Sequence, residues 1–188
     1  MTTMLKRISN FKFKVSSSEK GFTLIELLVV IGILGILASA LIATIDPFEQ
    51  LKKANDANLK NASVEYVNAN IRYYTTHSSL PWSDPAVSAA CNAGSIPTGL
   101  ALSAAAMSGC ISPLITEGEL KSGFTTVAAV MNGIIVSGST NGVTACFLPT
   151  SKSQMRDPNT RYTLSGVITA GCVSEASTGV STCYWCSL

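Results

Sequence analysis

A long apolar run near the start of the sequence limits what this chain can fold into more than any other feature. Residues 22–45 read FTLIELLVVIGILGILASALIATI, and Glu26 is the only charged residue among these 24. A helix rises about 1.5 Å per residue, so a run of this length spans about 36 Å, enough to cross a hydrocarbon core of roughly 30 Å with some tilt. The sequence therefore predicts a transmembrane helix at residues 22–45.

The residues before this run are basic. Against the single acid Glu19 stand five bases: Lys6, Arg7, Lys12, Lys14 and Lys20. Residues 1–21 thus carry a charge of +4, while the remaining chain carries −2. Because basic flanks stay in the cytoplasm, we expect a cytoplasmic leader and an extracytoplasmic chain after residue 45. Residues 22–188 carry a net negative charge, which gives no sign of a polyanionic partner, and we predict no nucleic-acid binding.

The boundary between leader and apolar run carries a motif, KGFTLIE at residues 20–26. It joins a base, a glycine, a phenylalanine and, four residues after the phenylalanine, a glutamate. This segment resembles the processing motif of type IV pilins and type II secretion pseudopilins. The resemblance implies that a prepilin peptidase cuts between Gly21 and Phe22 and methylates the new amino group of Phe22. It also implies that Glu26 pairs with the amine of an adjacent subunit during assembly.

Glu26 is unusual on physical grounds as well. A charged side chain costs about 2.5–3.5 kcal/mol at the bilayer centre on insertion scales, so an acid inside an apolar helix is a functional candidate. The helix dipole favours an anion in the first turns, and a free amine at Phe22 would be nearby. The alternative is that Glu26 extends to the interface and recognises nothing.

The apolar run has a second interpretation. Ala38, Ser39 and Ala40 form an A-x-A site behind a basic and an apolar region, which is typical of a secretory signal peptide. Against this interpretation, the run continues to Ile45, is longer than the usual apolar region of a signal peptide, and contains Glu26.

The next segment is predicted to continue the helix. Residues 48–74 contain no glycine or proline, and apolar residues recur along one face: Phe48, Leu51, Leu59, Ala62, Tyr66, Ala69 and Tyr73. Charged residues lie off that stripe: Lys52, Lys53, Asp56, Lys60 and Glu65. Pro47 predicts a kink or local melting where the helix leaves the membrane, without necessarily ending it.

The rest of the chain is predicted to form a small head. Residues 82–123 suggest an irregular insertion with short helices at residues 99–107 and 112–120. Strands are expected at residues 125–130, 133–137, 143–148, 162–169 and 183–185, with Asn141 and Gly142 as a hairpin turn. The predicted fold class is α+β, pilin-like, with a long N-terminal helix packed on a small antiparallel sheet. The expected regions are a leader (1–21), a transmembrane helix (22–45), its amphipathic continuation (46–80) and a disulfide-tied head (81–188).

All six cysteines lie beyond residue 90: Cys91, Cys110, Cys146, Cys172, Cys183 and Cys186. This placement indicates an oxidising compartment and makes all six disulfide candidates. Cys183 and Cys186 form a C-x-x-C, and residues three apart in a strand point to opposite faces, so the two sulfurs are expected to find different partners. The pairing stays open. Zinc, free thiols and redox chemistry are the alternatives to structural disulfides.

Little else in the sequence indicates chemistry. His77, the only histidine, lies in a polar turn and is predicted to be a surface residue. Asp84 and Asp157 lie in predicted loops without a ligand pattern that would hold calcium. The basic stretch at residues 152–161, followed by Tyr162, is interpreted as a solvated loop, with an acidic partner or DNA as the alternative. We predict no enzyme, no cofactor and no metal.

The resemblance implies a structural subunit of a type IV pilus or a type II secretion-type pseudopilus. Its implied partners are a prepilin peptidase, identical or related subunits, an inner-membrane assembly platform with its ATPase, and membrane lipid before assembly. The implied location is a single-pass membrane protein that becomes a periplasmic or cell-surface filament. The alternative is a secreted or membrane-anchored binding domain that does not polymerise.

Overall fold

The computed structural model describes residues 21–44, 46–169, 172, 174–175 and 180–187. The chain divides into two compact units, Met1–Ile45 and Asp46–Leu188, which we call the N-terminal unit and the head. Residues 1–20 of the predicted leader lie outside the described residues.

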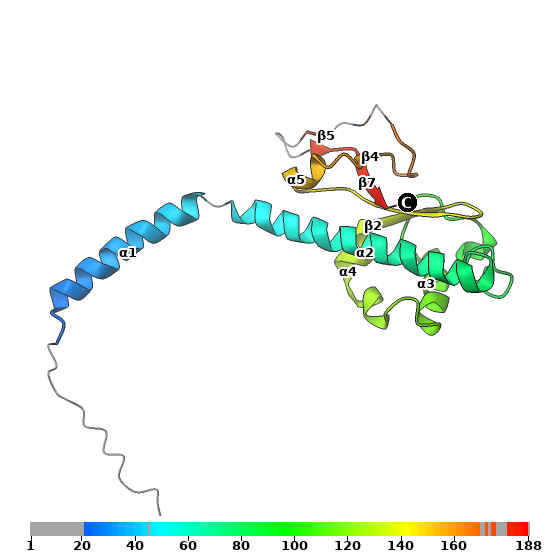
Figure 1. Ribbon diagram of the computed structural model, residues 1–188, viewed down its shortest axis with the longest axis horizontal. Helices are drawn as coiled ribbons and strands as arrows, with labels where there is room; N and C mark the ends of the chain where they lie inside the picture. Colours follow the sequence, from blue (N-terminus) through cyan, green and yellow to red (C-terminus); the bar gives the residue numbers. More distant parts are fainter. Residues whose placement is uncertain (1–20, 45, 170–171, 173, 176–179, 188) are drawn as a thin grey trace, which may run out of the picture. The chain divides into compact units, whose positions relative to one another are not determined.

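The described part of the N-terminal unit contains the helix α1 (Leu24–Thr44) (Figure 1). Its stretch Leu24–Ile42 is long and apolar enough to cross a membrane, and none of it is buried by the protein. A helix that is apolar all round and bare on every side needs a covering of lipid or of other protein. A transmembrane role for α1 therefore fits both its composition and its exposure.

The head begins with the long helix α2 (Pro47–His77), which starts with its own cap. The Asp46 carboxylate accepts hydrogen bonds from the backbone N–H groups of Phe48 and Glu49, and Pro47 occupies the first turn, where no N–H is needed. The sequence predicted a kink or local melting at Pro47 and left open whether the helix ends there. In the structure α1 ends at Thr44 and a second helix with its own cap begins at Pro47.

After α2 the chain forms short elements around one sheet. They are η1 (Asn92–Gly94), β1 (Leu100–Ala101), α3 (Ala105–Thr116), η2 (Ser122–Thr126), α4 (Ala128–Gly133), β2 (Ile134–Gly138), β3 (Val143–Phe147), α5 (Lys152–Met155), β4 (Thr160–Tyr162), β5 (Ser174–Glu175), β6 (Val180–Ser181) and β7 (Tyr184–Ser187). The antiparallel main sheet has the order β1-β2-β3-β7-β4, and β5 and β6 pair separately. The predicted α+β class is confirmed.

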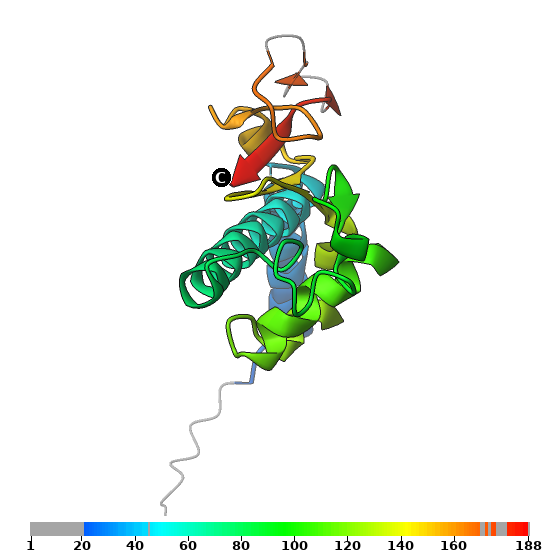
Figure 2. The same cartoon turned by 90° about the vertical axis from the view of Figure 1, so that its right-hand side faces the viewer.

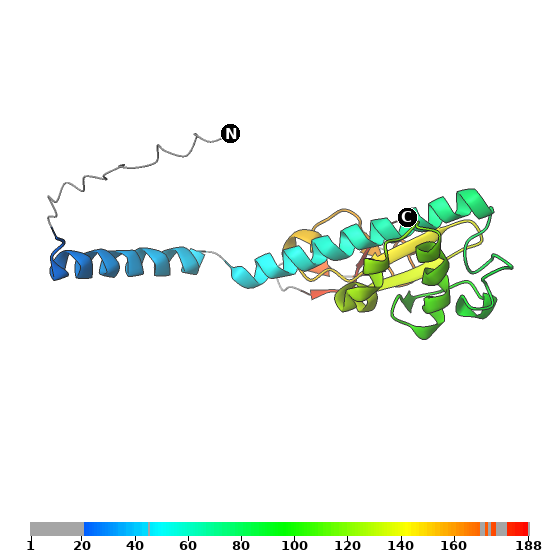
Figure 3. The ribbon, with the colours of Figure 1, turned by 90° about the horizontal axis from the view of Figure 1, so that it is seen from below.

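The core of the head lies between α2 and the sheet. Tyr66 and Tyr73 of α2 are buried together with Ile134, Val136 and Phe147 of the β2–β3 hairpin. Figure 3 shows α2 running along this hairpin, and Figures 1 and 2 show α3 and α4 on the side of α2 away from β4 and β7. The predicted hairpin at residues 133–148 is present, and its loop spans residues 139–142 because Gly138 pairs with Val143.

Three of the predicted elements are wrong, one strand and two helices. Residues 125–130, predicted as a strand, form the end of η2 and the start of α4, because Phe124 and Val130 turn inward into the core. The two helices predicted between residues 99 and 120 are one helix, α3, which runs through Gly109 and Pro113. A Cβ at Gly109 would lie 2.0 Å from the carbonyl oxygen of Ala90, so glycine is required where the preceding loop crosses the helix.

The strand predicted at residues 162–169 is also corrected. Strand β4 ends at Tyr162, and the chain reverses through Gly166, whose φ of +76° suits glycine. Hydrogen bonds between Thr163 and Val167 close this turn, and an isolated bridge joins Tyr162 to Ile168. The returning segment is therefore a loop rather than the rest of a strand.

Candidate functional site

The predicted processing and assembly residues lie together at the start of α1. Thr23 and Glu26 form a capping box: the Glu26 carboxylate accepts hydrogen bonds from the Thr23 N–H (2.8 Å) and the Thr23 hydroxyl (2.9 Å), and the Glu26 N–H donates to Thr23 Oγ1 (3.3 Å). The T-x-x-E spacing at residues 23–26 is the sequence signal for this cap. The structure thus gives Glu26 an intramolecular role in starting α1.

The two residues at the predicted cut are accessible. Phe22 is 87% exposed, and nothing lies within 4 Å of the position that a Cβ would take at Gly21. Both residues precede α1, so a peptidase meets an unwound backbone rather than a helix. Cleavage after Gly21 would leave the new amine of Phe22 one residue away from the Thr23 N–H that Glu26 already binds.

Within the head, the loop before α5 is held on α2 through Asp56, which sequence analysis placed off the buried stripe. Asp56 is only 1% exposed and accepts hydrogen bonds from the backbone and hydroxyl groups of Thr150 and Ser151, at 2.7–3.1 Å. These donors lie more than 90 residues away in the sequence, so no local pattern could have identified them. Asp56 holds the loop before α5 against the helix.

Two more charged residues of α2 contact the same segment. Glu49 accepts from the Lys152 N–H at 2.7 Å, and Lys60 forms an ion pair with Asp157 at 2.9 Å. The Lys60 ammonium also lies 4.9 Å from the ring centre of Trp185, a cation–π distance. Burial opposes ionisation of Asp157, but donors from Asn159 and Lys60 outweigh it and lower the pKa of this carboxyl.

A further polar group lies at the other end of α2. The Tyr73 hydroxyl donates to the buried Asp84 carboxylate at 2.7 Å, and this bond lowers the pKa of Asp84 while burial raises the pKa of Tyr73. His77 stacks on Tyr73 with ring centres 4.1 Å apart and lies 3.2 Å from Glu117. These contacts tie the end of the helix to the segments that follow it in the chain.

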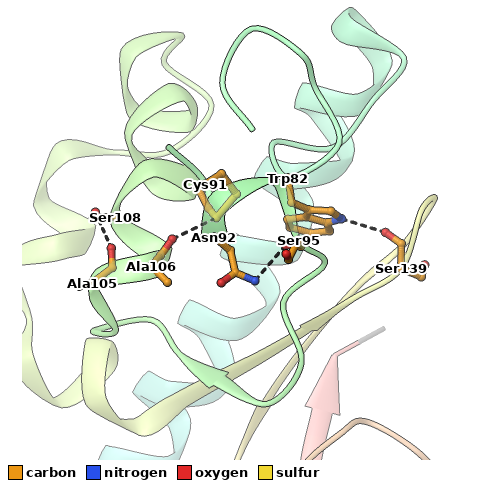
Figure 4. The surroundings of a disulfide bond; sticks show 9 residues. Trp82, Cys91, Asn92, Ser95, Ala105, Ala106, Ser108 and Ser139 are labelled. Atoms are coloured by element: carbon orange, nitrogen blue, oxygen red, sulfur yellow. Dashed lines mark hydrogen bonds between the residues drawn. A yellow bond between two sulfur atoms is a disulfide. The ribbon is translucent and has the colours of Figure 1, made fainter. Parts of the chain in front are cut away.

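All six cysteines form disulfides in the structure. Cys91 is bonded to Cys110, Cys146 to Cys186, and Cys172 to Cys183. The first ties the loop before η1 to α3, as Figure 4 shows, and there the Cys110 sulfur also lies 3.8 Å from the Ala106 carbonyl oxygen. The two cysteines of the C-x-x-C have different partners, since Cys186 is bonded to Cys146 in β3 and Cys183 to Cys172 outside the strands. Within the described residues no group of three or more His, Cys, Asp or Glu side chains could hold a metal ion.

An exposed apolar helix with a capped start, followed by a small disulfide-tied α+β head, is consistent with a pilin-like fold and fits a single-pass membrane protein. Residues 16–42 match the family model of the prokaryotic N-terminal methylation motif, the signature of type IV pilins and pseudopilins. This match supports a type IV pilin-like or pseudopilin precursor. No curated protein and no solved structure matches the chain at a significant level.

Proposed function

We propose that this chain is a structural subunit, not an enzyme, that polymerises through its N-terminal helix into a type IV pilus or a type II secretion-type pseudopilus. The observation that carries this proposal is α1 itself: an apolar helix bare on all sides, preceded by an accessible Gly21 and Phe22. Lipid covers such a helix in the membrane, and the same helices of neighbouring subunits cover it in a filament.

In this proposal residues 1–21 are a cytoplasmic leader and residues 22–45 the transmembrane segment. Residues 46–80 carry the amphipathic helix, and residues 81–188 complete an extracytoplasmic head. A prepilin peptidase cuts after Gly21 and methylates Phe22. An assembly platform and its ATPase then move the subunit from the membrane into the filament, where Glu26 pairs with the Phe22 amine of a neighbour.

A second candidate function is favoured by one observation. The capping box gives Glu26 a local role that needs no neighbouring subunit. A membrane-anchored extracytoplasmic binding domain would use Glu26 only to start α1. The two functions differ in what the negative charge of Glu26 does.

The N-terminal residue and its mass, measured on protein expressed with a prepilin peptidase, test the proposal first. A chain that begins with methylated Phe22 is the expected result. A start after Ala40 would instead indicate signal-peptide cleavage and a secreted domain, and an uncut chain would indicate a plain anchor.

A further inference from the structure

We propose that the start of α2, together with α5, forms a docking surface for anionic lipid headgroups, which holds the head on the membrane before assembly. We call this surface the basic collar: Lys52, Lys53, Lys152 and Arg156, with the apolar residues Phe48 and Leu51. The proposal rests on the membrane insertion of α1 and goes beyond the polymerising role of that helix.

The apolar part of the collar is the uncovered beginning of a buried stripe. Phe48 lies five helical turns before Tyr66 and so shares its face of α2. Tyr66 is buried in the core, whereas Phe48 is 74% and Leu51 68% exposed. Figures 1 and 3 both show the first turns of α2 extending past the rest of the head. Nothing in the described head therefore covers these two side chains.

The basic part of the collar comes from two segments that the fold joins. Glu49 binds the Lys152 N–H, which places α5 beside the first turns of α2. Lys52 and Lys53 each lie about one helical turn after Glu49 and about one turn before Asp56. They therefore lie on either side of the face of α2 that α5 contacts. Arg156 is the C-cap residue that directly follows α5. All four basic side chains are exposed, and none forms an ion pair with the residues that the structure describes.

The acids of this region are already occupied by the protein itself. Asp46 caps α2, Glu49 binds the Lys152 N–H, Asp56 holds Thr150 and Ser151, and Asp157 pairs with Lys60. Each of these carboxylates accepts hydrogen bonds from internal donors. Accepting these bonds leaves the carboxylates charged, so the region holds five bases, counting Lys60, against four acids, a net charge of +1. The collar bases are all exposed, whereas Asp56 is buried and Glu49 and Asp157 are partly buried.

The position of the collar in the chain selects a membrane as its partner. Only residues 45 and 46 lie between the last residue of α1 and the first residue of α2. The first residues of the collar therefore follow within a few residues of the helix that we propose to span the bilayer. Exposed aromatic and leucine side chains beside several lysines and arginines are the composition of a helix that lies at a lipid interface. Basic residues near such a surface are attracted to anionic headgroups.

A Phe48→Trp variant of the full chain tests this proposal, because Trp82 and Trp185 are 1% and 5% exposed and supply a background little affected by lipid. The variant is placed in nanodiscs at one copy per disc, in phosphatidylcholine alone or mixed with phosphatidylglycerol. Incorporation into the discs reports insertion of α1 separately. We expect the added tryptophan to shift to the blue and to be quenched by brominated lipid in the anionic discs only, and high salt to reverse both effects.

Removing charge from the collar gives the decisive comparison. Lys52→Gln with Lys53→Gln is expected to lower the ratio of docked to free heads about 30-fold. The control, Lys121→Glu, makes the same change in net charge at an exposed residue outside the collar and should leave docking unchanged. Equal signals in neutral and anionic discs, or none in either, would overturn the proposal. A signal only in discs that hold several copies would assign the surface to a second subunit instead.

Discussion

The capping box at the start of α1 allows the two roles of Glu26 to be separated. Its carboxylate accepts two hydrogen bonds from Thr23, at 2.8 and 2.9 Å. A variant that removes the whole side chain loses both the cap and the negative charge, so Glu26→Ala alone cannot decide between them. Glu26→Gln retains a group that can complete the box, whereas Thr23→Ala removes the cap and keeps the carboxylate.

The expected energies of the two roles differ enough to measure. Losing a helix cap costs about 1 kcal/mol, with a range of about 0.5–2. A hydrogen bond to a charged group contributes about 1.5–3 kcal/mol, which corresponds to roughly 10- to 150-fold in the equilibrium between adjacent subunits. If Glu26 pairs with a neighbouring Phe22 amine, Glu26→Gln loses this stronger contact between subunits and keeps most of the weaker stabilisation from the cap.

Filament yield after shearing, normalised to inserted and processed protein, is the assay. We expect Glu26→Gln and Glu26→Ala to lose most filaments, and Thr23→Ala to keep most of them. The mass of each chain shows whether cleavage after Gly21 is unaffected, so that failed processing is not mistaken for failed assembly. Wild-type yield from Glu26→Gln, together with equal losses from Thr23→Ala and Glu26→Ala, would refute the charge-pairing role and leave the cap as the function of Glu26.

Three predictions concern the head. Asp56→Ala should lower its free energy of unfolding by about 3 kcal/mol or more in chemical denaturation, since several donors lose their acceptor, whereas the exposed Asn55→Ala should change little. The lowered pKa of Asp84 in the folded head stabilises the head at pH values above 3.8, the ordinary pKa of this carboxyl. This stabilisation is lost as the pH falls through the lower pKa of the folded state. Tyr73→Phe should therefore flatten the acid end of a plot of unfolding free energy against pH. Gly109→Ala should lower the melting temperature because its Cβ meets backbone, and Gly123→Ala, with nothing within 4 Å, should not.

Local patterns predicted the parts of the fold that local forces decide. The unbroken apolar run indicated α1, the absence of glycine and proline indicated most of α2, and Asn141-Gly142 indicated the central hairpin. Local patterns failed where a contact distant in sequence decides the backbone. Residues 125–130 have strand composition, yet the burial of Phe124 and Val130 beside α2 makes them helical.

The same distinction applies to the functional residues. The T-x-x-E cap at residues 23–26 is a local signal that sequence reasoning missed, although it was readable. The contacts of Asp56 and Lys60 were not readable, because their partners follow about a hundred residues later. A charge that lies off an apolar stripe is usually solvated, and only the fold shows that the loop before α5 covers this side of α2.

The division of α2 into a covered and an uncovered part links the two proposals. From Leu59 onward the head buries the apolar face of the helix, but Phe48 and Leu51 stay exposed. Under the docking proposal these side chains insert at the boundary between lipid headgroups and acyl chains, and in a filament neighbouring helices would cover them, so the two states would exclude each other. The cost of leaving an anionic membrane then opposes assembly.

Weakening the collar should therefore favour assembly as long as subunit contacts are unchanged. We expect Lys52→Gln with Lys53→Gln to raise the initial rate of filament formation in membranes that contain phosphatidylglycerol, and to have no effect in neutral ones. The measurement is filament mass against time after the assembly ATPase is supplied, with Lys121→Glu as the charge-matched control. A slower rate in both membranes would mean that these lysines bind a neighbouring subunit, since a lipid contact that competes with assembly can only delay it.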